Sequence, residues 1–294
     1  MRLIDYLDDM SCRIANKIGL RHTHFTKKEL VLRKLRRVVG YNYINQYLYP
    51  DRFVQGHVIW VIWAQGQENM PMIVQRCFES IIRNRGTYQV ILLNNENIKE
   101  FVNLPDFIYK KHEDGIISYA HFSDIIRFTL LSRYGGYYLD ATIYLTHPLP
   151  IRDRLYTIKQ NYSEDYISYC QWTSFFWYVP KGHPLARFLS DYLISYWNKN
   201  DTIIDYFLLD YLIRIFYEKN IDFRKEIDSI NCNNPDLYFF QSSECENVFD
   251  SDKWDNICMS TSIFKLNWKR SSICETEGHD TFYGMLIKGL LVYE

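Results

Sequence analysis

Apolar residues follow two different periods along the chain, and together they predict strands and helices in alternation. Continuous apolar runs rich in β-branched and aromatic residues, with short turns around them, are typical of buried parallel strands. They occur at 57–64, 87–94 and 137–145. Apolar residues at helical spacing occupy 72–84, a short segment around 97–102, and 119–136. The order strand, helix, strand, helix, strand predicts an α/β sheet with crossover helices.

The N-terminal part has a different pattern. Between Arg2 and Val39 the apolar spacing predicts two amphipathic helices, and six cations interleave with the apolar residues of 27–39. We therefore divide the chain into a basic amphipathic helical extension, 1–52, and a main domain, 53–294. Two interpretations of the extension stay open: a helical prefix packed on the main domain, or attachment of residues 1–40 to an anionic membrane surface.

Charge and composition narrow the function classes. Thirty-four basic and 35 acidic residues give a net charge of −1, which argues against nucleic acid as the main ligand. Seven cysteines without a CxxC pair indicate neither a disulfide framework nor a zinc site, and a reducing compartment is the simpler expectation. No apolar run approaches 18 residues, and the N-terminus lacks the apolar core of a secretory signal.

Candidate chemistry gathers where the predicted strands end. In such sheets ligands bind beyond the carboxyl ends of the strands, here near 64–66, 94–95 and 140–142. Asp140 ends an apolar strand, where an ionised carboxylate needs a cation, hydrogen bonds or solvent. Asp124 and Arg127 are three residues apart on one helix, close enough to pair. A plain helix ion pair, a helix cap at Gly135 and Gly136, and a capping acid are the structural alternatives.

The order of these residues resembles a known family. Ser123-Asp-x-x-Arg127, Tyr134-Gly-Gly136 and Tyr138-Leu-Asp-Ala-Thr142 are similar to the motifs of the capsular polysaccharide synthesis glycosyltransferases, relatives of the glycosyltransferases with a DXD sugar-binding region. The resemblance extends to 59–81 and, more weakly, to the aromatic-rich region after Ser174, to 206–213 and to 263–269, so that it covers about 55–275. It does not cover residues 1–50.

The resemblance implies a GT-A-type fold, a Rossmann-like mixed sheet flanked by helices that binds a nucleotide sugar. It implies transfer of a hexose, glucose or galactose, from a UDP-sugar to a lipid-linked oligosaccharide acceptor in capsular or cell-surface polysaccharide synthesis, with retention of configuration. It also implies a cytoplasmic protein, peripheral on the inner face of the cell membrane.

The family pattern also implies roles for individual residues. Asp140 and Asp124 would be catalytic, and Asp140 and Thr142 would meet a metal ion. Trp60 or Trp63 would flank the nucleobase, and Asn94 or Asn95 the ribose. The further donor-binding residues would be Ser123, Arg127, Gly136, Tyr138, Thr142, Lys265 and Lys269.

One departure from the family pattern affects the metal. Thr142 stands where a second carboxylate of Asp-x-Asp is expected, and a hydroxyl is a poor replacement for a charged ligand. We favour a manganese or magnesium ion, which oxygen ligands suit, held by Asp140 with groups elsewhere such as Asp205, Asp210 or Asn267. The alternative is that Lys265, Lys269 and Arg270 neutralise the diphosphate.

Two other functions stay open on the same fold. The protein could bind a nucleotide sugar or glycan without turnover, as Thr142 suggests, or it could be a glycoside hydrolase if a second acid lies near Asp140 in space. The aromatic cluster at 172–178 is either a wall for a sugar acceptor or a buried strand.

Overall fold

The computed structural model describes residues 27–291 and residue 293. Its helices are α2 (Lys27–Val38), α3 (Tyr41–Asn45), α4 (Met72–Arg83), α5 (Ile98–Phe101), α6 (Asp106–Glu113), α7 (Tyr119–Tyr134), α8 (Pro184–Lys199), α9 (Leu208–Lys219), α10 (Ile221–Ser229), α11 (Ser251–Ser260) and α12 (Phe282–Lys288). Its strands are β1 (Val58–Ile62), β2 (Gln89–Leu93), β3 (Gly136–Asp140), β4 (Ile143–Leu145), β5 (Tyr156–Thr157), β6 (Phe176–Val179), β7 (Ile263–Lys265), β8 (Glu275–Thr276) and β9 (His279–Asp280).

A five-stranded mixed sheet forms the centre of the molecule, in the order β2-β1-β3-β6-β5. β1 pairs in parallel with β2 and β3, whereas β6 runs antiparallel to both β3 and β5. β4 and β7 make a separate antiparallel pair, as do β8 and β9. The mixed α/β sheet flanked by helices that the sequence predicts is confirmed.

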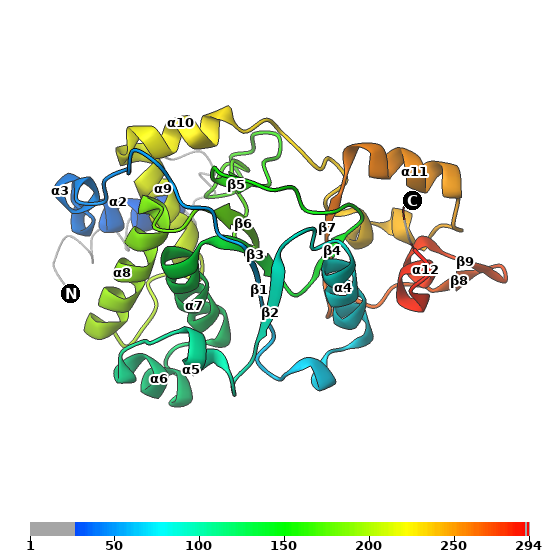
Figure 1. Ribbon diagram of the computed structural model, residues 1–294, viewed down its shortest axis with the longest axis horizontal. Helices are drawn as coiled ribbons and strands as arrows, with labels where there is room; N and C mark the ends of the chain where they lie inside the picture. The colour runs from blue at the N-terminus through cyan, green and yellow to red at the C-terminus, as the bar shows by residue number, and fades with distance from the viewer. Residues whose placement is uncertain (1–26, 292, 294) are drawn as a thin grey trace, which may run out of the picture.

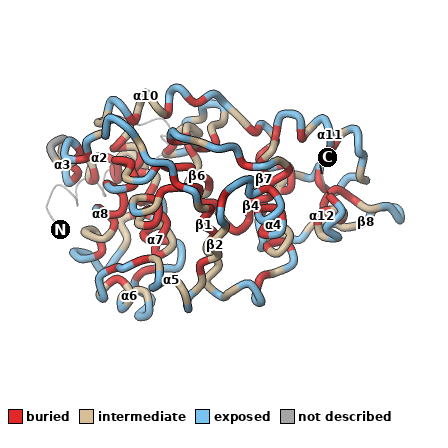
Figure 2. The backbone as a smooth tube through the Cα atoms, viewed as in Figure 1, coloured by how far each residue is buried: buried red, intermediate tan, exposed pale blue. Residues whose placement is uncertain are grey.

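Alternate residues of the strands enter two hydrophobic cores on opposite faces of the sheet. On β3, Tyr138 joins the core formed with α7, α8 and α9, whereas Tyr137 and Leu139 join the core formed with α4, α11 and α12. Figure 1 shows these two groups of helices on either side of the strands, and Figure 2 shows that the buried stretches follow the strands and the helices beside them.

The apolar run at 137–145 is not one strand. It divides into β3, in the central sheet, and β4, which pairs with β7. The break lies at Ala141 and Thr142, where the Asp140 carboxylate accepts a hydrogen bond from the Thr142 backbone N–H at 2.9 Å. The prediction of a single strand is therefore wrong, because a side chain takes over the hydrogen bonding that would have continued the sheet.

The paired glycines lie at the other end of β3, where they end α7 and allow two strands to approach. Gly136 has φ 99°, and a Cβ atom on it would lie 2.2 Å from the carbonyl oxygen of Val58 on β1. Only glycine permits that contact at that φ.

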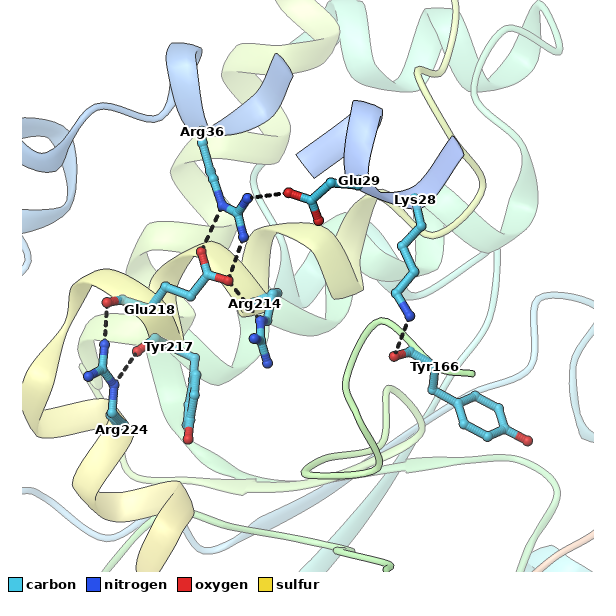
Figure 3. A network of polar contacts seen from close by, with 8 residues as sticks. All are labelled: Lys28, Glu29, Arg36, Tyr166, Arg214, Tyr217, Glu218 and Arg224. Carbon is cyan, nitrogen blue, oxygen red and sulfur yellow. Dashed lines mark hydrogen bonds and ion pairs between the residues drawn. The ribbon is translucent and has the colours of Figure 1, made fainter. Parts of the chain in front are cut away.

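The predicted second helix of the extension is α2, and the first, within 1–26, lies outside the described residues. Leu30, Val31, Leu32 and Leu35 are buried. The last three belong to the core that includes α9, against which α2 packs. Arg36 donates to both oxygens of Glu218 on α9, and Arg214 shares that carboxylate (Figure 3). The apolar face of α2 is thus used inside the protein.

Within 27–291, no helix combines the length and the apolar character needed to cross a bilayer.

Candidate active site

Asp140, Thr142 and Lys265 form a polar cluster at the carboxyl end of β3. The Thr142 hydroxyl donates to Asp140 Oδ1 at 2.6 Å, and Lys265 Nζ lies 3.2 Å from the same oxygen. Lys265 Nζ also donates to Thr142 Oγ1. The pairing of β4 with β7 sets Lys265 opposite Ile143, so a residue more than 120 positions away arrives beside the motif.

The cluster keeps Asp140 ionised. Burial alone would raise the pKa of the carboxyl group, but the Lys265 ammonium and the two hydrogen bonds from Thr142 outweigh it and lower the pKa below its usual value. The Asp140 side chain remains 35% exposed. A negative charge is therefore held next to a fixed cation at an accessible position.

These groups alone are a sparse set of ligands for a divalent cation. Mg²⁺ is usually held by one or two carboxylates, with waters and substrate phosphates completing the site. The cluster offers one carboxylate and one hydroxyl, and a lysine ammonium already lies against both. Among the described residues, no three or more His, Cys, Asp or Glu side chains gather to hold a metal. Asp205, one of the groups considered from the sequence, pairs with Lys27 at 2.8 Å. The manganese or magnesium ion stays a prediction.

Asp124 and Arg127 face each other on α7, as their spacing predicts. Arg127 Nη2 lies 3.1 Å from Asp124 Oδ1, and the guanidinium carbon lies 4.3 Å from the ring centroid of Tyr138. Arg127 Nη1 donates to the backbone oxygen of Ser174. Burial raises the pKa of Asp124 to about 6, although Arg127 opposes the rise.

Two cavities meet at the cluster and share Asp140, Phe175 and Lys265. We call the first, of about 400 Å³, the donor cavity, after the donor-binding role that the sequence predicts for Trp63, Lys265 and Lys269. Its other lining residues are Ile62, Trp63, Ala141, Thr142, Tyr238, Gln241, Leu266, Asn267, Trp268 and Lys269. We call the second, of about 280 Å³, the α9 cavity; its other lining residues are Ala120, Ser123, Asp124, Arg127, Ser174, Tyr206, Phe207, Leu209 and Asp210. A larger hollow, lined by 49–55, His57, Asp153, Arg154, Asp222 and Glu226, includes none of these site residues.

Most of the residues predicted for the site line these cavities. Asp140, Thr142, Lys265, Lys269 and Trp63 line the donor cavity. Ser123, Asp124 and Arg127 line the α9 cavity. The sequence prediction thus brought together residues from α7, β3, β7 and the segments that follow β1 and β7.

Four of the predicted donor-binding residues lie elsewhere. Trp60 is 1% exposed in the core, and its indole N–H donates to the Gly135 oxygen at 3.0 Å. Of the two tryptophans considered for the nucleobase, only the half-buried Trp63 lines a cavity. Gly136 is at the opposite end of β3 from Asp140, and its role is the contact with β1. Tyr138 is buried under Arg127 and positions that side chain.

Asn94 is the fourth. Its side-chain oxygen accepts from the backbone N–H groups of Glu96 and Asn97, both at 3.0 Å. It therefore orders the turn after β2, and it lines neither cavity.

Burial and pairing bear on two alternatives that the sequence leaves open. In the aromatic cluster 172–178, Trp172 and the whole of β6 are buried, so the cluster is a core strand, and only Phe175 reaches the cavities together with Ser174. Arg270 donates to the backbone oxygens of Gln241 and Ser242. These hydrogen bonds tie the segment after β7 to the segment that contains Gln241.

Some cavity residues were not among those predicted for the site. Trp268 lies with its ring centroid 5.8 Å from that of Trp63, at 87°, and Tyr206 and Phe207 come from the start of α9. What these three residues share is a large ring exposed at the surface, and exposure cannot be read from the sequence.

Comparisons with known proteins identify the family of the chain. Residues 14–286 match the family of capsular polysaccharide synthesis proteins. A stretch of 96 residues, 30% of the chain, is 31% identical to the O-glycosyltransferase braB of Annulohypoxylon truncatum, and it covers 23% of that protein's length. Among solved structures, the PaToxG glycosyltransferase superposes with a TM-score of 0.42 and 15% identity over 68% of this chain and 83% of that chain.

Proposed function

The chain belongs to the family of capsular polysaccharide synthesis proteins, and from that premise we propose that it is a glycosyltransferase. The family is the one that the motifs between Ser123 and Thr142 resemble. More narrowly, we propose transfer of a hexose from a UDP-sugar to a lipid-linked saccharide. The observation that carries the proposal is the Asp140–Thr142–Lys265 cluster at the junction of two cavities.

The donor cavity suits a nucleotide diphosphate. Its volume of about 400 Å³ lies within the usual range of small-molecule sites. Trp63 and Trp268 offer ring surface to a base. The Lys269 ammonium lies 5.4 Å from the Trp268 ring centroid. A second cation, Lys265, lines the donor cavity where it adjoins the α9 cavity.

Lys265 has the central role in the proposed chemistry. As the bond between the anomeric carbon and the diphosphate breaks, negative charge develops on the leaving phosphate, and a cation fixed beforehand stabilises it most. Asp140 and Thr142 fix the Lys265 ammonium. Asp124 and Arg127, on the far side of Asp140, are placed to bind hydroxyl groups of the donor sugar.

Retention of configuration, the hexose and the lipid-linked acceptor rest on the family resemblance. So does a location at the inner face of the membrane. The structure contributes one refinement: α2 buries its apolar residues against α9, so the proposed contact with anionic lipid uses charge and not insertion of this helix.

The test is release of UDP from a panel of UDP-hexoses by the purified protein, with manganese and, in parallel, with EDTA. We expect release from a restricted set of sugars that persists in EDTA, because Lys265 supplies the positive charge. Release that requires manganese would support the divalent cation predicted from the sequence and assign Lys265 a lesser role.

A non-catalytic binding protein is the second candidate, favoured by Thr142 in place of an acid. Binding of UDP-sugars, measured by calorimetry, without UDP release from any of them would support it and contradict a transferase that uses these donors.

A further inference from the structure

The strand that carries Lys265 has two edges, and each is held by a different part of the chain. On one edge β7 pairs with β4, and a hydrogen bond from the Leu266 N–H to the Thr142 oxygen extends that pairing. The N–H groups of Ile263 and Lys265 donate on the other edge. Within the described part of the chain no strand pairs with β7 there, so these backbone groups need partners from elsewhere.

The side chain of Asn234 takes the place of a strand on this edge. Its oxygen Oδ1 accepts from the backbone N–H groups of Ser262 at 2.9 Å and of Ile263 at 3.0 Å. One side-chain oxygen thus satisfies two adjacent backbone donors at the start of β7. Asn234 is 4% exposed, and its amide nitrogen donates to the Asn233 side-chain oxygen at 2.8 Å, which fixes the orientation of the amide.

The segment that follows Asn234 continues this support as far as Lys265. The Leu237 oxygen accepts from the Lys265 backbone N–H at 2.7 Å, and the Gln241 amide donates to the Lys265 backbone oxygen, also at 2.7 Å. The Leu237 N–H in turn donates to the Asn234 backbone oxygen at 3.0 Å. The backbone on both sides of the Lys265 side chain is therefore held from outside the β4–β7 pair.

The backbone at Asn234 is itself fixed in an uncommon conformation. Its φ is 49°, in the left-handed region that glycine, asparagine and aspartate enter most readily. The Gln160 amide donates to the backbone oxygens of Asn233 at 2.7 Å and Asn234 at 2.9 Å, so the turn is also tied to the segment after β5. The side chain thus reaches β7 from a firmly held turn.

The place of the Lys265 ammonium depends on this support, because lysine carries its charge on a flexible four-carbon stem. Asn234 lines neither the donor cavity nor the α9 cavity, so it can act on the reaction only through the residues that it holds. We propose that Asn234 is a positioning residue for Lys265: by holding the start of β7 it sets where the ammonium meets Asp140 and Thr142. The effect on catalysis rests on the proposed function, whereas the placement of Lys265 does not.

The first test measures the placement of Lys265 and needs no activity. The folded protein is treated with a limiting amount of an acetylating N-hydroxysuccinimide ester, and mass spectrometry gives the acetylation rates of Lys265 and Lys269. In the wild type the Lys265 ammonium donates to Asp140 and Thr142, and the side chain is 19% exposed. Asn234→Gly removes the acceptor and suits the positive φ. In this variant we expect Lys265 to react about three- to tenfold faster and Lys269 to react at the wild-type rate.

The second test measures the reaction. Asn234→Gly should lower kcat for UDP release about tenfold, because displacing a charge at the reacting centre by about 1 Å is costly, and it should leave the donor KM within about twofold. Asn234→Asp keeps an acceptor oxygen and tolerates the same φ, so kcat should return to within about threefold of the wild type. Added to Lys265→Met, Asn234→Gly should lower kcat no further, because the cation that Asn234 positions is gone.

Asn220→Gly is the matched control. The Asn220 side-chain oxygen also accepts from a backbone N–H, that of Phe223 at 2.9 Å, and Asn220 lines neither cavity. Its acetylation rates and UDP release should match those of the wild type. Circular dichroism checks that each variant is folded. Asn234→Gln, which moves the amide oxygen by one methylene, is the second variant and should shift both measurements in the same direction as Asn234→Gly.

Three results would overturn the positioning role. One is a wild-type rate of Lys265 acetylation in Asn234→Gly and Asn234→Gln, and another is wild-type kcat in both. The third is a further loss of kcat when Asn234→Gly is added to Lys265→Met, as a general defect of folding would give. A wild type that releases no UDP would instead count against the proposed function, and acetylation would still decide the placement of Lys265.

Discussion

At the scale of single residues, the site depends on how one aspartate is held. Asp140 could be predicted, because an acid at the end of an apolar strand is costly without a purpose. The choice between Trp60 and Trp63 could not be predicted, because it depends on which hydrophobic core each ring packs against. The sequence indicates Asp210 only as one of several groups that could help to hold a metal. Its nearness to Asp124 could not be predicted, since only the packing of α9 brings the two together.

Removing the charge of the cluster should remove activity. Asp140→Asn and Asp124→Asn should each abolish transfer without unfolding the protein, and Lys265→Met should lower kcat by about 100-fold or more, since each loses a preorganised charge at the reacting centre. UDP release and circular dichroism check this. Lys269→Gln, which alters an exposed cation in the same cavity, should cost far less. Wild-type turnover in Asp140→Asn would contradict the assignment.

The raised pKa of Asp210 makes a prediction about stability. The pKa is about 6 in the folded protein and about 3.9 in an unfolded chain, so between these values the folded state holds more protons and stability falls as pH rises. Asp210→Asn should therefore be more stable than the wild type at pH 7.5, by about 1–3 kcal/mol, with the difference vanishing near pH 4.

Urea unfolding at several pH values measures that difference. Asp255→Asn, an exposed change on α11, is the control and should stay within about 0.5 kcal/mol of the wild type at every pH. A gain for Asp210→Asn that does not shrink at low pH would show that ionisation is not its cause.

At the scale of elements, the periodicity of the sequence predicted β1, β2, α4 and α7 nearly to their ends. It failed at 137–145, because the end of β3 is decided by the Asp140 side chain and β4 exists only through its pairing with β7. The spacing of apolar residues predicts neither the end of β3 nor the start of β4, since both strands are buried and the apolar run continues through them.

The close approach of β1 and β3, which pair in parallel, gives the prediction at the scale of elements. Gly136→Ala should destabilise the protein by about 3 kcal/mol or more, because a Cβ there meets the backbone of Val58 at 2.2 Å. Gly115→Ala is the matched control: Gly115 also has a positive φ, 73°, but no atom within 4 Å of the added carbon, so only the backbone strain of about 1–2 kcal/mol remains. Equal losses in denaturant unfolding would contradict the close approach.

At the scale of the whole molecule, the two cores and the central sheet hold together segments from both ends of the chain. α2 contributes to the same core as α7, α8 and α9, so the basic segment is anchored to the main domain along this helix. Lys27, Lys28 and Arg36 contact protein groups, whereas Arg37 is exposed and is a candidate for a surface contact.

Association with membranes should therefore be electrostatic. We expect the protein to sediment with vesicles that contain 30 mol% or so of anionic lipid, and to dissociate as salt rises from about 0.05 to 0.5 M, since each cation near such a surface contributes about 1 kcal/mol that ions screen. Vesicles of neutral lipid are the control. Binding that salt does not weaken would rule out this mode.

The pairing of β4 with β7 also has a consequence for synthesis of the chain. Thr142 and Lys265 are 123 residues apart, which a ribosome translates in roughly 6–25 s. During that interval β4 has emerged without its partner strand, and Asp140 without its cation. A nascent chain stopped before residue 263 would expose an apolar strand edge, the kind of surface that molecular chaperones bind. The segment from residue 263 onward therefore decides when β4 is covered and when Asp140 acquires its cation.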